Sequence, residues 1–264
     1  MTVATVSIRP AGTFHYRRSG AGPTVVLIHA GFLDHRMWSE THVALSSHHD
    51  VISYDVRGAG SSSRDDVVHS PSQDLGALLD ELDIERAALI GLSMGARIAF
   101  ELAAAQPARI SSATLCSLAL PEFITSDCDG MLPEFIRALT EGRSEVATQL
   151  YTRMWFDGRR ERSSVDAERR AEFAGLVDLT FAETFVHQEW RTLDEIGAVQ
   201  EIRTPTLFVA GRDDWPDIND TVAALNAMMP DSAAISIDGA AHTLNLDQPG
   251  ELLRIANHFL SAHP

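Results

Sequence analysis

Short apolar runs, each followed by a turn and then by a helix-like stretch, recur along this chain of 264 residues. Such runs occupy residues 25–28, 51–54, 87–90, 112–116, 206–210 and 233–237. Short runs that are apolar on both faces are typical of parallel strands covered by helices on both sides. The alternation predicts right-handed crossovers and an α/β fold built on a mostly parallel, doubly wound sheet.

Helix-like stretches separate these runs at 71–82, 94–106, 217–229 and 249–260, several of them bounded by proline. The closely spaced runs at 3–8 and 13–18 are predicted to form an antiparallel hairpin at the edge of the sheet.

One segment, residues 121–202, lacks any strand-like run and is charged and helix-like, with scattered aromatic residues. It is too long for a structureless loop in a compact domain. We therefore predict a helical insertion at 121–202, after the sixth strand, and a core domain made of residues 1–120 and 203–264. The charged stretch 158–170 within the insertion is expected to be solvated.

The charge balance excludes several classes of partner. Acidic residues number 37 against 21 basic ones, a formal net charge of −16, which disfavours binding to nucleic acids and to anionic membranes. No apolar run approaches the roughly 18 residues of a membrane-spanning helix, and the first residues do not resemble a signal peptide. We expect a cytoplasmic protein that acts on a small molecule.

The sequence contains no recognisable cofactor-binding or metal-binding motif. The two cysteines, Cys116 and Cys128, do not make a disulfide framework. The G-x-G at Gly58 and Gly60 lacks the third glycine of a dinucleotide fingerprint, since Ser63 stands there. Neither a P-loop nor a zinc motif occurs, so we expect no cofactor and no metal.

A candidate nucleophile lies between a strand and a helix. Residues 91–95 read Gly-Leu-Ser-Met-Gly, the G-x-S-x-G pattern in the strand–turn–helix context that it requires. A sharp turn there would expose the Ser93 hydroxyl at the carboxyl end of the sheet. The flanking glycines would allow strand and helix to approach closely. The other interpretation is a glycine-flanked turn with an incidental serine.

A base and an acid follow in the chain order Ser, Asp, His. His242 comes after the last strand and its turn and before the final helix, whereas most of the 11 histidines have no comparable context. Two aspartates, Asp213 and Asp214, follow the preceding strand. Either could orient the imidazole and stabilise its cation.

The tetrahedral intermediate of acyl transfer needs fixed N–H donors. Met94 follows the nucleophile and is the first candidate. The second would come from the loop after strand 25–28, where Gly31 is preferred to Phe32. His29 in this loop is expected to be structural, and Asp34 is expected to cap the next helix.

Together these motifs resemble the α/β-hydrolase superfamily, specifically its small capped serine esterases, and the resemblance covers nearly the whole chain. Residues 91–95, with Asp-Ile-Glu-Arg at 83–86, are similar to 3-oxoadipate enol-lactonases and carboxylesterases. The resemblance selects Asp214 as the acid, three residues after Gly211, and implies that the insertion is a cap. Where the family commonly has His-Gly, this chain has His29-Ala30, with the glycine one residue later.

The resemblance implies hydrolysis of a carboxylic ester or lactone through an acyl-enzyme, with Ser93, Asp214 and His242 as the triad. Alternatives are a C–C bond hydrolase acting on a β-diketone-type substrate, a lyase or cyclase, and a non-catalytic binding member of the fold. The insertion arginines Arg137, Arg143 and Arg153 are either solvated surface charge or a site for a substrate carboxylate. The sequence does not indicate the substrate or the oligomeric state.

Overall fold

The computed structural model describes residues 2–8, 12–197 and 199–264. Among these residues one mixed sheet of eight strands runs in the order β1-β2-β4-β3-β5-β6-β7-β8. The strands are β1 (Thr2–Ile8), β2 (Gly12–Ser19), β3 (Thr24–Ile28), β4 (Asp50–Tyr54), β5 (Ala87–Leu92), β6 (Ile110–Cys116), β7 (Thr206–Gly211) and β8 (Ser232–Ile237). The strands β3 to β8 are parallel to one another, while β1 and β2 form the antiparallel edge that the sequence predicts.

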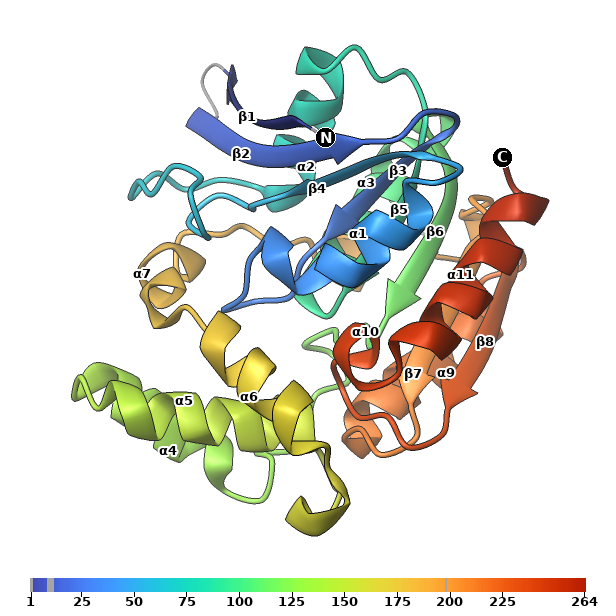
Figure 1. Cartoon of the computed structure of the whole chain (residues 1–264). Helices are drawn as coiled ribbons and strands as arrows, with labels where there is room; N and C mark the ends of the chain where they lie inside the picture. Colours follow the sequence, from blue (N-terminus) through green and yellow to red (C-terminus); the bar gives the residue numbers. More distant parts are fainter. Residues whose placement is uncertain (1, 9–11, 198) are drawn as a thin grey trace.

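Helices cover both faces of the sheet (Figure 1). The longer ones of the core are α1 (Ser39–Leu45), α2 (Pro71–Glu81), α3 (Met94–Ala105), α9 (Pro216–Met228) and α11 (Pro249–Ala262), with the short α10 (Leu244–Asp247) before α11. The fully apolar strands are explained by two cores. In β3, Val26 and Ile28 pack with α2 and α3, while Val25 and Leu27 pack on the α1 and α11 side.

The last strand departs from the both-faces-buried prediction. The run 233–237 is a parallel strand, but it lies at the end of the strand order and most of it is exposed. Ile235 is 39% exposed. An edge strand has a neighbour on one side only, so an apolar sequence alone does not establish that a strand is buried.

Between β6 and β7 the described residues form helices joined by turns and loops, and they contain none of the sheet's strands. This part contains α4 (Met131–Thr140), α5 (Ser144–Thr152), a π-helical turn (Arg153–Asp157), α6 (Ala167–Leu176), α7 (Ala182–Phe185) and α8 (Leu193–Ile196). Figure 1 shows α4, α5 and α6 as a layer below the carboxyl ends of the strands. The assignment of residues 121–202 to a domain of their own stays a prediction.

No helix of the described residues has both the length and the apolar character needed to cross a membrane.

The packing of α3 against the sheet gives a first prediction. A Cβ on Gly95 would lie 2.1 Å from the carbonyl oxygen of Ile28, which is main chain and has no freedom to move aside. We expect Gly95→Ala to lower the free energy of unfolding by about 1–3 kcal/mol, measured by urea denaturation. The matched control is Gly250→Ala in α11, where a Cβ meets nothing within 4 Å. Equal free energies of unfolding for the two variants would show that the approach of α3 is not tight.

Candidate active site

Ser93 occupies a strained turn between β5 and α3. Its backbone has φ 55° and ψ −112°, a region that residues with a Cβ rarely adopt. Such conformations cost of order 1–3 kcal/mol and need support from their surroundings. The support comes from the Ser93 N–H, which donates to the Cys116 carbonyl at 2.9 Å, and from Gly91 and Gly95, which allow the strand and helix backbones to approach.

Asp214 and His242 lie at the carboxyl ends of β7 and β8 and contact each other directly. His242 Nδ1 is 2.8 Å from Asp214 Oδ2. Both side chains are buried, and Asp214 also accepts a hydrogen bond from the Trp215 N–H at 2.8 Å. A carboxylate so placed fixes the tautomer in which Nε2 is the free basic nitrogen.

Asp213 has a different role from Asp214. Its main-chain N–H donates to the Ala240 carbonyl at 3.0 Å, and its carbonyl accepts from the Arg159 N–H at 2.9 Å. Its backbone therefore joins the β7 turn both to the loop before His242 and to the helical insertion.

The end of β6 links Ser93 to His242. Cys116 accepts the Ser93 N–H, and the next residue, Ser117, donates its hydroxyl to the His242 carbonyl at 2.8 Å. Among the described residues the Ser93 hydroxyl makes no hydrogen bond to the His242 imidazole. The structure thus joins Asp214 to His242 directly and joins Ser93 to His242 only indirectly, through Cys116 and Ser117 at the end of β6.

The candidate oxyanion donors also lie close together. A Cβ on Gly31 would lie 3.9 Å from Met94 Cβ, so the loop after β3 adjoins the start of α3. In the described part of the chain the main-chain N–H groups of Gly31, Phe32 and Met94 donate no hydrogen bond to another protein group. Phe32 has φ 57°, so the displaced glycine leaves a bulky residue in a conformation that favours glycine.

His29 and Asp34 hold this loop as the sequence predicts. The buried His29 accepts the Val56 N–H at Nε2 and lies 2.8 Å from the Ala30 carbonyl through Nδ1. Burial lowers the pKa of His29, in keeping with a neutral ring. Asp34 caps the short 3₁₀ helix His35–Trp38 by accepting the Arg36 N–H.

Comparison with known proteins identifies the family, since the model of the α/β-hydrolase fold matches residues 23–249. The chain belongs to this family. A curated relative, 3-oxoadipate enol-lactonase 1 of Acinetobacter baylyi, is 28% identical over 91% of this chain and 89% of its own length. Another, 2-hydroxy-6-oxo-2,4-heptadienoate hydrolase of Pseudomonas putida, is 25% identical over 92% of this chain and 91% of its own.

Solved structures agree on the fold. The enol-lactonase from Burkholderia xenovorans has a TM-score of 0.82 with this chain, at 24% identity, over 98% of this chain and 100% of its own. At this identity the likeness establishes the α/β-hydrolase fold alone.

Two aromatic residues of the insertion approach the site in a way that the sequence did not indicate. The Trp155 ring lies 4.6 Å from the His242 ring, centroid to centroid. The Tyr151 hydroxyl donates to the Gly31 carbonyl at 2.6 Å. Because both residues are far from the site in sequence and follow no family motif, their positions depend on how the insertion folds.

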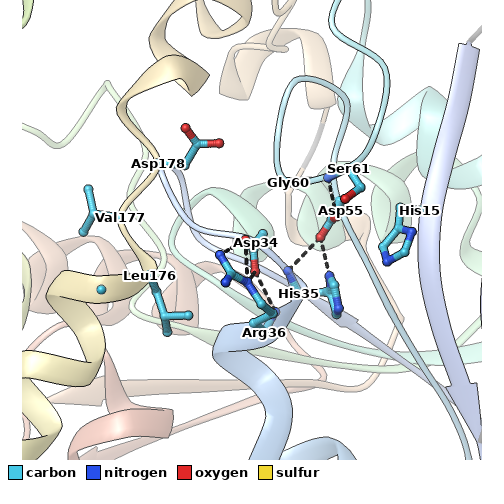
Figure 2. Close-up of a pocket in the computed structure, with 11 residues that line it drawn as sticks. His15, Asp34, His35, Arg36, Asp55, Gly60, Ser61, Leu176, Val177 and Asp178 are labelled. Carbon is cyan, nitrogen blue, oxygen red and sulfur yellow. Dashed lines mark hydrogen bonds and ion pairs between the residues drawn. The ribbon is translucent and has the colours of Figure 1, made fainter.

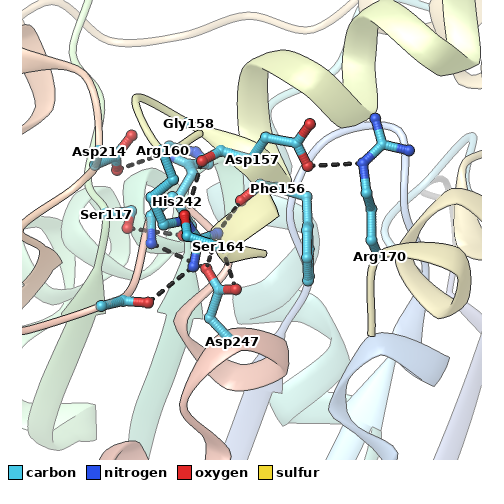
Figure 3. Close-up of polar contacts among 12 residues, drawn as sticks. Ser117, Phe156, Asp157, Gly158, Arg160, Ser164, Arg170, Asp214, His242 and Asp247 are labelled. Atoms are coloured by element: carbon cyan, nitrogen blue, oxygen red, sulfur yellow. Dashed lines mark hydrogen bonds and ion pairs between the residues drawn. The ribbon is translucent and has the colours of Figure 1, made fainter. Parts of the chain in front are cut away.

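The stretch 158–170 is only partly solvated, which corrects the sequence-based expectation. Arg160 is about 10% exposed and bonds both carboxylate oxygens of Asp247, at 3.0 and 2.9 Å, and the Gly239 carbonyl at 2.8 Å. Figure 3 shows Arg160 and Asp247 close to His242. Asp247 in turn accepts the N–H of Ala241, the residue before His242. An arginine of the insertion therefore holds both sides of the His242 loop.

The three insertion arginines weighed as carboxylate binders have partners within the insertion. Arg137 and Arg143 pair with Glu134, and Arg143 also pairs with Glu141. Arg153 donates to the carbonyls of Gly158 and Arg160. These contacts favour a structural role over substrate binding.

A cavity of about 590 Å³ lies beside the loop after β3 (Figure 2). Its lining is largely polar and comes from β2, the 3₁₀ helix His35–Trp38, the loop after β4 and the end of α6. None of its lining residues is Ser93, Asp214 or His242.

The pairing of Asp247 gives a second prediction. Burial raises the pKa of Asp247 to about 6, against the opposing effect of Arg160. The folded chain therefore binds this proton more tightly than the unfolded chain does. The resulting stabilisation is full below the ordinary aspartate pKa of about 3.9 and is lost as the pH rises through about 6.

We expect the stability of the wild type relative to Asp247→Asn to fall between about pH 4 and pH 6, by at most about 3 kcal/mol. Chemical denaturation of both proteins at several pH values measures this difference. If the denaturation midpoints of the wild type and of Asp247→Asn changed equally with pH over that range, the raised pKa of Asp247 would be contradicted.

Proposed function

We propose that this α/β-hydrolase cleaves a carboxylic ester or lactone through an acyl-enzyme, with Ser93 as nucleophile, His242 as base and Asp214 as the acid that orients it. The observation that carries the proposal is the buried His242–Asp214 hydrogen bond of 2.8 Å, at the same edge of the sheet as the strained, half-buried Ser93 turn. The lactonase relative supports the choice of substrate class.

In this mechanism His242 Nε2 takes the proton of Ser93 as the hydroxyl oxygen attacks the carbonyl carbon. The negative charge that develops on the carbonyl oxygen is stabilised by the N–H of Met94 and by a donor from Gly31 or Phe32. His242 then gives its proton to the leaving alkoxide and later activates the water that releases the acid. The imidazole needs to reach the hydroxyl only in the reacting complex.

Ser93→Ala tests the nucleophile. Turnover of an activated short-chain ester should fall by roughly 10⁶, because no other described group replaces the attacking oxygen. A fluorophosphonate should label wild-type protein on Ser93 and should leave the variant unlabelled, as followed by intact mass. Ser261→Ala, on the exposed end of α11, should label like the wild type. Undiminished hydrolysis by Ser93→Ala would refute the proposal.

Tyr151→Phe tests the oxyanion loop. The Tyr151 hydroxyl holds the carbonyl of the Gly31–Phe32 peptide and so fixes where the N–H of that peptide points. Removing this hydroxyl leaves the Gly31 carbonyl unpaired and loses a hydrogen bond that contributes roughly 0.5–1.5 kcal/mol. Because that bond orients a candidate oxyanion donor, we expect kcat to fall about tenfold with KM little changed. Tyr16→Phe on β2 is the control. A change in KM alone would instead indicate that Tyr151 contacts substrate in the ground state.

C–C bond hydrolysis is the second candidate, favoured by the relative named for an oxo-heptadienoate, a substrate that carries a ketone. The products separate the two reactions. An ester gives an acid and an alcohol and a lactone gives a hydroxy acid, whereas a β-diketone-type substrate gives an acid and a ketone. A non-catalytic binding protein would release none of these products and would not be labelled by a fluorophosphonate.

A further inference from the structure

Three side chains of metal-ligating type meet beside the cavity of about 590 Å³, away from the proposed triad. They are His15 on β2, His35 at the start of the 3₁₀ helix His35–Trp38, and Asp55 directly after β4. One ligand atom from each lies within 4.8 Å of the other two. Figure 2 shows the His15 ring beside the His35–Asp55 pair, with all three at the cavity wall.

The main chain already holds these three residues in place. The Asp55 N–H donates to the His15 carbonyl at 2.9 Å, and the His35 N–H donates to Asp55 Oδ1 at 2.9 Å. The Ser61 N–H donates to Asp55 Oδ2 at 2.9 Å, which orients the carboxylate. Ligands fixed by such supporting bonds lose little freedom when they bind an ion.

The Asp55 carboxylate lacks a permanent cation as a partner. Of the other charged groups at the cavity, Arg36 is paired with Asp34, and Asp178 is paired with Arg64. Among the described residues Asp55 is bonded by imidazole and main-chain N–H groups, and by no arginine. Burial alone would raise the pKa of Asp55, but its contacts with His35 hold that pKa below the usual value.

The two imidazoles offer nitrogen to an ion. The rings of His15 and His35 lie 5.2 Å apart, centroid to centroid, and the ring nitrogens of His15 make no hydrogen bond within the described part of the chain. His35 Nδ1 is hydrogen-bonded to Asp55 Oδ1 at 2.6 Å. Two imidazoles and one carboxylate suit zinc and related first-row metals, whereas magnesium and calcium prefer oxygen ligands alone.

We propose that His15, His35 and Asp55 bind one divalent transition-metal ion, of the kind that Zn²⁺ represents, at the wall of this cavity. The ion takes the place of the proton between His35 and Asp55, which is released to solvent. Bonds from zinc to nitrogen and oxygen are about 2.0–2.2 Å, so His35 and Asp55 separate slightly from 2.6 Å on binding. Solvent in the cavity supplies the remaining ligands.

Equilibrium dialysis of the tag-free chain against zinc chloride, followed by metal analysis, tests the proposal. We expect one tightly bound Zn²⁺ per chain, and at least about tenfold weaker binding in His15→Ala and in His35→Ala. His258→Ala, an exposed histidine on α11, is the matched control and should bind like the wild type. Cobalt in place of zinc should give a visible absorption band that His15→Ala removes.

Circular dichroism checks that the variants fold. If His35→Ala fails to fold, His15→Phe decides the question, because the His15 ring makes no hydrogen bond to any residue that the structure describes. Less than one ion per wild-type chain, or equal affinity in the wild type and the His15 and His35 variants, would overturn the site. Ser93→Ala should bind zinc like the wild type, so the result is independent of the proposed hydrolysis.

Discussion

The close approach of α3 to the ends of β3 and β5 is the constraint on which the candidate site depends. A Cβ on Gly91 would meet the Gly95 carbonyl oxygen at 2.1 Å, and one on Gly95 would meet the Ile28 carbonyl at the same distance. With the helix start this near, the chain can turn only through a strained residue, Ser93. The same approach brings the first N–H of α3 next to Gly31, so the positions of the candidate nucleophile and of the candidate oxyanion donors share one cause.

Parallel strands explain how distant residues come together. The residues that follow β5, β6, β7 and β8 are Ser93, Ser117, a turn ending at Asp214, and the loop containing His242. Because these four strands are neighbours and run the same way, their carboxyl ends form one edge. The spacing of these residues along the chain is irrelevant, and only the strand order matters.

Much of this arrangement could be predicted from local signals. Continuous apolar runs marked the strands, prolines marked the helix ends to within a residue or two, and the motif at 91–95 marked the turn. The exposed face of β8 could not be predicted, because sequence does not say which strand ends a sheet. The cluster of His15, His35 and Asp55 was missed for a similar reason, since each of the three lies twenty positions after the one before it and short-range metal motifs do not describe it.

The insertion is bonded to both halves of the candidate site. Tyr151 holds the carbonyl of Gly31, the Asp178 N–H donates to the Phe32 carbonyl at 2.8 Å, and Arg160 holds the loop that carries His242. A segment that only covered the substrate could change freely without touching the chemistry. Here a substitution that reshapes the insertion also moves the candidate oxyanion loop or the loop of the proposed base, His242. Substrate selectivity and turnover should therefore change together in this chain.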